Sequence, residues 1–166
     1  MEIVSRILEG SLLSGSGGEP GRFFEGRVTQ DDKIARLEDV TLLEACSYKQ
    51  LRAVARITDV LELPAGTMLA RAGEPGNEFF LIVEGAARVE VSPRKRSRLG
   101  PGDYFGEMSL LDGGPRSATV VAETPVRLLV INRRNFTTLL REAPALTQNL
   151  LITLSKRLRQ AEAAGR

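Results

Sequence analysis

One segment, residues 100–120, combines glycines with a single glutamate and a single arginine in a pattern that could bind a small anion. Glu107 begins what looks like one helical turn, and Gly106 before it would let a ligand approach the backbone closely. A helix N-terminus offers unpaired N–H groups and the positive end of a dipole, which favour an anion. Arg116 opens an apolar strand, where a buried guanidinium needs an anionic partner, and phosphate fits its planar fork well. Glu107 beside such an anion needs hydroxyl donors, so the segment predicts an anionic ligand that carries hydroxyl groups.

The same residues admit a second interpretation, in which no ligand is bound. An ion pair between Glu107 and Arg116 could close the turn made by residues 113–115. Each charge would then satisfy the other inside the protein. The residue chemistry alone leaves both interpretations open.

The composition excludes several classes of catalytic site. The 166 residues include no histidine and one cysteine, Cys46. Catalytic triads that need histidine, histidine-ligated metals, an intrachain disulfide and an iron–sulfur cluster are therefore ruled out. We expect a protein that is not an enzyme, with no metal and no cofactor. Twenty-three basic against 21 acidic residues leave a net charge of +2, which makes nucleic acid an improbable partner.

The sequence also carries no sign of membrane insertion or export. No apolar run is long enough to span a bilayer, and the first 13 residues are interrupted by Glu2, Arg6 and Glu9. A signal peptide would need an unbroken apolar core there. We expect no membrane span and a cytoplasmic location.

Short β-type runs separated by glycines fill the middle of the chain. They lie at residues 60–63, 67–71, 79–83, 87–91, 117–122 and 126–131. This spacing predicts a mostly β fold with flanking helices, an antiparallel β-roll of the jelly-roll or double-stranded β-helix type. The basic run 93–98 is interpreted as a solvated hairpin tip.

Helical spacing flanks these strands on both sides. One helical stretch is predicted from Asp31 to about Ile57. After the strands, Asn132 is a suitable N-cap for a short helix, and Pro144 suits the first position of a second helix that runs to about Ala164. We therefore expect N-terminal helices and a C-terminal helix pair.

The last helix carries a short heptad-like seam of apolar residues at Leu151, Leu154, Leu158 and Ala161. Such a seam suits a partner helix in a homodimer, although the helix could also pack on its own roll. A Gly/Ser-rich run at residues 14–21 marks a linker. We predict a flexible or partner-binding arm over residues 1–30 and a ligand-binding domain over residues 31–166.

Two stretches, 105–107 and 115–120, resemble the phosphate-binding cassette of the cyclic-nucleotide-binding domain family. That family includes the catabolite activator protein, the regulatory subunits of cyclic-AMP-dependent protein kinase and nucleotide-gated channels. Residues 63–85 are similar to the family's first, glycine-punctuated strands, and residues 132–144 to the helix that follows the roll. The resemblance covers about 120 residues, from near Ala45 to Ala164.

The resemblance implies roles for the cassette residues. Glu107 would accept a hydrogen bond from the ribose 2′-hydroxyl, and Arg116 would pair with the exocyclic phosphate oxygens. Backbone N–H groups near Gly106, Met108 and Ala118 would complete the phosphate site.

The resemblance does not fix whether the ligand is cyclic AMP or cyclic GMP. The Ser117 hydroxyl would add a donor, and a serine there is compatible with cyclic AMP and with cyclic GMP. We expect cyclic AMP as the ligand and cyclic GMP as the alternative. The family usually covers the base with the last helix, where Gln160 and Glu162 are the polar candidates.

We therefore expect a stand-alone regulatory module that binds a cyclic nucleotide and signals to an unknown effector protein. Two alternatives stay open. One is a non-binding adaptor in which Glu107 and Arg116 pair with each other. The other is a fragment of a transcription regulator like the catabolite activator protein, because the sequence ends at Arg166 without a helix-turn-helix domain.

Overall fold

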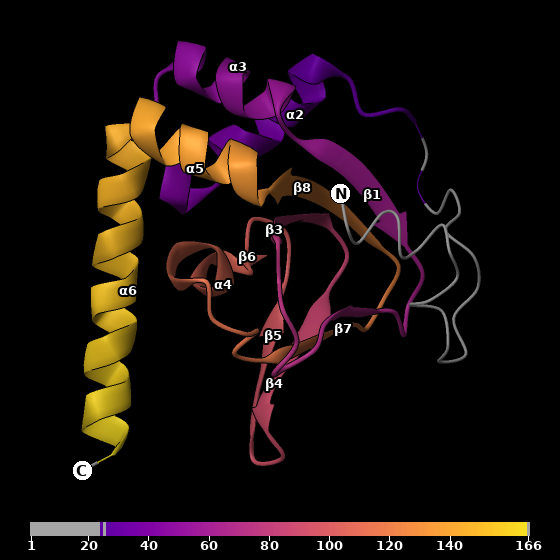
Figure 1. Cartoon of the computed structure of the whole chain (residues 1–166). Helices are drawn as coiled ribbons and strands as arrows, with labels where there is room; N and C mark the ends of the chain where they lie inside the picture. The colour runs from indigo at the N-terminus through magenta and orange to yellow at the C-terminus, as the bar shows by residue number, and fades with distance from the viewer. Residues whose placement is uncertain (1–23, 25, 166) are drawn as a thin grey trace.

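Two antiparallel four-stranded sheets pack face to face in the computed structural model, which describes Phe24 and residues 26–165 (Figure 1). The first sheet has the order β1 (Asp59–Leu63), β8 (Val126–Asn132), β3 (Glu78–Glu84) and β6 (Tyr104–Phe105). The second has the order β2 (Met68–Ala70), β7 (Thr119–Ala122), β4 (Ala87–Ser92) and β5 (Lys95–Leu99). The predicted antiparallel β-roll is confirmed.

Two strands of the first sheet, β3 and β8, are buried on both faces because the molecule has two apolar cores. In β8, Val126, Leu128 and Val130 face the core between the two sheets, whereas Leu129 and Ile131 face the core beneath the helices. A strand buried on both sides reads as a continuous apolar run rather than as an alternation. This explains the uninterrupted apolar stretch in the sequence after Arg127.

The predicted helical stretch 31–57 is confirmed as helical, although it is not one continuous helix. The structure divides it into α2 (Gln30–Glu38), a 3₁₀ turn η1 (Thr41–Leu43) and α3 (Tyr48–Arg56). The physical reason is local: Ser47 and Gln50 form a capping box that starts a new helix, as Thr29 and Asp32 do for α2. Hydrogen bonds from the Thr29 backbone and hydroxyl lower the pKa of Asp32.

The two C-terminal helices begin where the sequence predicts. The side chain of Asn132 accepts a hydrogen bond of 2.9 Å from the Asn135 amide at the start of α5 (Arg133–Glu142). Pro144 is the first residue of α6 (Pro144–Ala164). Figure 1 shows α2, α3 and α5 at one end of the roll and α6 running from there past α4 (Glu107–Asp112).

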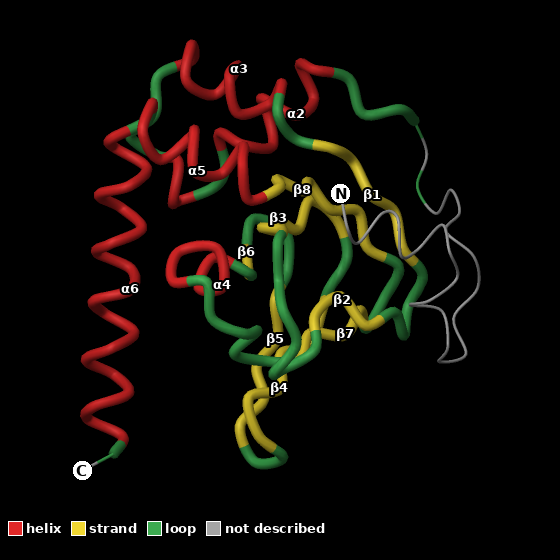
Figure 2. Tube along the Cα trace, viewed as in Figure 1, coloured by secondary structure: helices red, strands yellow, loops and turns green. Residues whose placement is uncertain are grey.

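The interpretation of residues 93–98 as a hairpin tip needs correction, because most of them form a strand. Figure 2 shows β4 and β5 as two long arms joined by a short turn. Residues 95–99 pair with β4, so that Arg98 lies opposite Arg88 and Arg96 opposite Glu90. β5 is an edge strand, where charged side chains are tolerated, and those charges hide the β pattern in the sequence.

The predicted arm over residues 1–30 lies almost entirely outside the described residues. Its boundary with the domain therefore stays a prediction. Within the described part of the chain, no helix has the length and apolarity that crossing a bilayer requires.

Candidate functional site

Two left-handed glycines delimit the short helix at the centre of the candidate site. Gly106 caps the start of α4 with φ of 95°, and Gly113 caps its end with φ of 72°. A Cβ at Gly106 would lie 2.6 Å from the Glu78 carbonyl oxygen and 2.7 Å from Arg116 Nη1. Gly106 is therefore required twice, for its backbone conformation and for the close approach of Arg116.

Arg116 is buried, with 7% of its surface exposed, and its guanidinium is held by the backbone around it. Nη1 donates to the Gly106 carbonyl at 3.2 Å, and Nη2 donates to the Glu78 carbonyl at 3.0 Å. A Cβ at Gly76 would clash with the same guanidinium, which also lies over the Phe80 ring at 5.7 Å. The side chain is thus positioned rigidly at the start of β3.

Glu78 provides the charge that faces Arg116. Its Oε2 lies 3.5 Å from Arg116 Nη2, and both side chains are almost fully buried. Glu78 is not among the residues that the sequence predicts for the site. Its position directly before the apolar run 79–83 is a weak signal, because an acidic residue there usually marks the exposed start of a strand.

The backbone around Arg116 is fixed by a neighbouring turn. The Arg116 amide donates to the Glu74 carbonyl at 2.8 Å, and the Gly73 amide donates to the Arg116 carbonyl at 2.9 Å. The next two residues, Ser117 and Ala118, lead into β7, and Ser117 is exposed. The predicted segments 105–107 and 115–120 therefore meet in space through Gly106 and Arg116.

Glu107 is also buried, with 3% of its surface exposed, and it pairs with a residue from the last helix. Arg157 Nη1 donates to Glu107 Oε1 at 2.6 Å. The Arg157 side chain is half-exposed, and its guanidinium lies over the Tyr104 ring at 5.7 Å. Helical spacing could have identified Arg157, since it shares the roll-facing side of α6 with Leu150 and Leu154.

Tyr104 completes the surface against which α6 lies. Its hydroxyl is buried and has no hydrogen bond of normal geometry within the described residues. Burial raises the pKa of the Tyr104 phenol, while nearby Thr153 and Arg157 oppose that rise. The site is therefore bordered by α6 on the side of Glu107.

The internal ion pair between Glu107 and Arg116, considered as an alternative from the sequence, is not formed. Arg116 faces Glu78, and Glu107 faces Arg157. Two buried charges of opposite sign thus lie at the same turn, each with a different partner.

The other predicted residues are more exposed. Met108 is exposed on α4. Gln160 and Glu162 are exposed on the last turns of α6, and the side chain of neither forms a hydrogen bond or ion pair with another described residue. The described residues also contain no cluster of three or more histidine, cysteine or carboxylate side chains able to hold a metal ion.

The family of this chain follows from comparison with known sequences. The sequence model of the "Cyclic nucleotide-binding domain" matches residues 60–143, which include β1 to α5 and both buried charges of the site. The chain belongs to the cyclic nucleotide-binding domain family. Members of this family bind cyclic AMP or cyclic GMP, and they are generally regulatory rather than catalytic.

Two bacterial ion channels are among the similar proteins. The chain is 41% identical over 165 residues to a cyclic nucleotide-gated potassium channel of Rhizobium etli, with 93% of this chain and 46% of the channel covered. It is 37% identical over 155 residues to a cyclic nucleotide-gated potassium channel of Mesorhizobium japonicum, with 87% of this chain and 43% of that channel covered. The chain therefore spans less than half the length of these relatives.

The same fold occurs in a solved structure with a bound nucleotide. The structure of cAMP-bound PfPKA-R has a TM-score of 0.73 to this chain at 25% identity, and the match covers 82% of this chain and 47% of that one. The likeness agrees with the β-roll and flanking helices described above.

Proposed function

We propose that this domain binds cyclic AMP, with cyclic GMP as the alternative ligand, between α4, Arg116 and α6, and that it signals the nucleotide to an effector. One observation carries the proposal: the buried Arg116 and Glu107 lie at the same turn with only Gly106 between the guanidinium and the carboxylate-bearing helix. A cationic fork beside a hydroxyl acceptor matches a cyclic phosphate fused to a ribose.

In this proposal Arg116 and Glu107 bind different parts of the nucleotide. Arg116 pairs with the exocyclic phosphate oxygens, and backbone N–H groups near Gly106, Met108 and Ala118 complete the phosphate site. Glu107 accepts a hydrogen bond from the ribose 2′-hydroxyl. The exposed Ser117 hydroxyl is available as a further donor.

We expect the position of α6 to depend on whether the nucleotide is bound. Glu107 is almost completely covered, and Arg157 of α6 holds one of its oxygens. Because Glu107 is almost completely covered and Arg157 is one of the groups that contact it, we expect a ribose hydroxyl at Glu107 to displace Arg157, which links binding to the position of α6. Gln160 and Glu162, farther along that helix, remain the candidates for contact with the base.

Titration calorimetry tests the proposal directly. Cyclic AMP, cyclic GMP and a cyclic dinucleotide would each be titrated into the same protein. We expect the largest affinity for cyclic AMP. No heat with any of the three at millimolar concentration would contradict the proposal and favour a non-binding adaptor.

Replacing Glu107 with alanine is expected to weaken cyclic AMP binding by about 1 to 3 kcal/mol, because one charged acceptor is lost. The measurement is calorimetry, with the exposed Glu142→Ala as control. Arg157→Ala should change the affinity as well, and the double variant should be non-additive because the two residues share one ion pair. Strict additivity would show that Arg157 does not act through Glu107.

We further propose a homodimer joined through α6. Leu151 and Leu158, two residues of the predicted seam, are 60% and 61% exposed, whereas Leu154 between them packs on the core. Exposed leucines one heptad apart are typical of a helix–helix interface. Leu158→Glu is expected to convert the protein to a monomer in sedimentation velocity. Ile152→Glu, at an exposed position outside the seam, should leave the oligomeric state unchanged, and a monomeric wild type would contradict the proposal.

The similar channels favour a second candidate function, in which this domain regulates a potassium channel. The effector would then be a pore rather than a separate protein. Potassium flux from vesicles that contain the product of the complete reading frame, with and without cyclic AMP, separates the two candidates. A reading frame with a helix-turn-helix domain would instead identify a transcription regulator. The cytoplasmic location stays a prediction in each case.

A further inference from the structure

A row of three charges crosses the first sheet at the end away from α4. Glu62 of β1 and Glu84 of β3 both lie in register with Arg127 of β8, which stands between them. Arg127 donates to Glu62 Oε1 from Nη2 at 2.7 Å and from Nε at 3.0 Å, and to Glu84 Oε1 from Nη1 at 3.2 Å. The Arg127 side chain is nearly inaccessible to solvent, in contrast to a typical surface ion pair.

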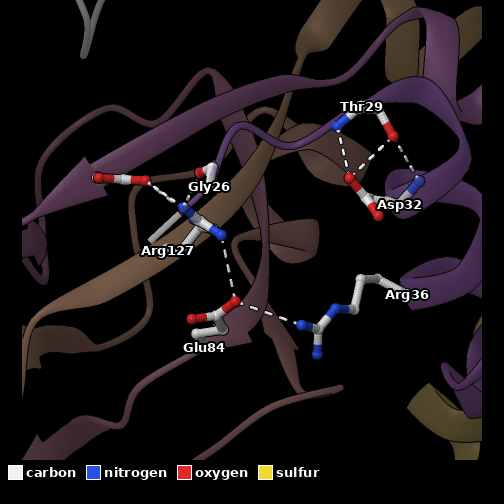
Figure 3. A network of polar contacts seen from close by, with 7 residues as sticks. Gly26, Thr29, Asp32, Arg36, Glu84 and Arg127 are labelled. Atoms are coloured by element: carbon white, nitrogen blue, oxygen red, sulfur yellow. Dashed lines mark hydrogen bonds and ion pairs between the residues drawn. The ribbon is translucent and has the colours of Figure 1, made fainter. Parts of the chain in front are cut away.

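Residues before α2 contact this row, and Figure 3 shows Gly26 beside Arg127. The Gly26 carbonyl accepts a hydrogen bond of 3.0 Å from Arg127 Nη2, and the Phe24 ring lies 5.1 Å from the guanidinium carbon. Arg36 of α2 adds a second cation, with its Nη2 3.3 Å from Glu84 Oε1. We call Glu62, Glu84, Arg127, Arg36 and the Gly26 carbonyl the Arg127 cluster.

Residues 26–38 supply two members of the Arg127 cluster, the Gly26 carbonyl and Arg36. Two carboxylates face Arg127, and Arg36 from α2 supplies the cation that balances the second one. A buried guanidinium also needs acceptors for its remaining N–H groups, and Gly26 provides one. The Phe24 ring shields the guanidinium from water on the same side. Removing the segment would therefore uncover a buried charge.

The strand that carries Arg127 leads directly to the candidate site. At its other end, Asn132 caps α5, and Arg133 donates to the Ser109 carbonyl of α4 at 3.1 Å and to the Gly76 carbonyl at 3.0 Å. A single strand thus joins the helix of the cassette to the Arg127 cluster. A shift of α4 would act on β8 through Arg133.

We propose that the Arg127 cluster is a joint that connects the nucleotide-binding roll to residues 26–38. Through this joint, the packing of residues 26–38 depends on whether the nucleotide is bound. The coupling rests on the proposed function, because it needs a ligand at Arg116 and Glu107. Residues 26–38 are held to β8 through Arg127, and a shift of α4 is transmitted to them along β8. A merely stabilising ion-pair cluster would hold the segment equally in both states.

Hydrogen exchange read by mass spectrometry on the full chain tests the joint, with and without cyclic AMP. Wild-type protein is expected to change its exchange over residues 26–38 when cyclic AMP binds. In Arg127→Met, the same amides should exchange about tenfold faster without ligand and should no longer respond to cyclic AMP. The affinity for cyclic AMP, measured by calorimetry on the same samples, should stay within about threefold of wild type.

Further variants keep the test decisive if Arg127→Met lowers the stability of the whole roll. Phe24→Leu removes only the ring contact, and Arg36→Met breaks only the link from α2 to Glu84, so both should weaken the response with the roll intact. Arg134→Met, at an exposed position on α5, is the matched control and should behave as wild type.

Two results would overturn the joint while leaving the proposed function intact. They are cyclic AMP binding without any change over residues 26–38, and a full response in Arg127→Met. Absence of cyclic AMP binding in wild-type calorimetry would instead refute the proposed function, and the coupling with it. Unchanged exchange in ligand-free Arg127→Met would show that the cluster does not hold the segment at all.

Discussion

Arg116→Ala is expected to weaken the binding of cyclic AMP by about 2 to 4 kcal/mol, or about 30- to 1,000-fold. The variant leaves the cyclic phosphate without the charge-assisted hydrogen bonds of the guanidinium in a site shielded from water. Arg116 is fixed by the Gly106 and Glu78 carbonyls, so no other arginine can take its place without rebuilding the turn. Calorimetry with cyclic AMP measures the effect, with the exposed Arg134→Ala as control.

The same substitution removes the cation that faces the buried Glu78, so stability must be measured in parallel. Breaking one partner of a buried pair costs about 3 to 5 kcal/mol. Arg116→Lys separates the two effects, because lysine keeps a positive charge near Glu78 but lacks the planar fork that grips a phosphate. We expect Arg116→Lys to melt closer to wild type than Arg116→Ala and still to bind weakly. Wild-type affinity in both variants would refute the assignment of Arg116 to the phosphate.

Gly106→Ala is expected to disturb both the fold and the site. A residue other than glycine in a left-handed conformation costs about 1 to 3 kcal/mol. The added Cβ would also come within 2.6 Å of the Glu78 carbonyl and 2.7 Å of Arg116 Nη1. One of these groups must move, so we expect stability to fall by more than the backbone strain alone and nucleotide affinity to fall with it.

The other end of α4 offers a matched control. Gly113 also has a positive φ, but a Cβ there would meet nothing within 4 Å. Gly113→Ala should therefore show the backbone strain alone, with little loss of affinity. Chemical denaturation and calorimetry on both variants measure the difference. Equal effects at the two glycines would mean that the close approach of Arg116 to Gly106 is unimportant.

Features with local causes were predictable from the sequence. Asn132 and Pro144 start their helices through their own side chains, and both positions are confirmed. The strands at 79–83 and 126–131 were recognisable because a buried sheet demands continuous apolar residues. β5 was missed because an edge strand does not need apolar residues. The helical stretch after residue 31 was not divided because buried apolar residues continue through the turn between its two helices.

The partners of the buried charges were not predictable in the same way. Arg116 meets the carbonyl of a residue 38 positions away, Glu107 meets Arg157 across 50 positions, and Arg127 meets Gly26 across 101. An arginine of this chain could pair with any of 21 acidic residues, and a glutamate with any of 23 basic residues. Nothing in the spacing of the residues selects among them.

The sequence by itself determined the family, the antiparallel roll, and the two residues, Glu107 and Arg116, on which the proposed site depends. The roll follows from glycines at turns and from the spacing of short apolar runs. The family and the two residues follow from the resemblance of residues 105–107 and 115–120 to the phosphate-binding cassette. All of these are properties of short segments. Only the tertiary structure decided that Arg116 lies against Glu78, that Glu107 pairs with Arg157 of the last helix, and that Arg127 binds the Gly26 carbonyl. The reason is physical: a buried charge must find its counter-charge wherever the fold brings one within reach, and the packing of the whole molecule determines that place.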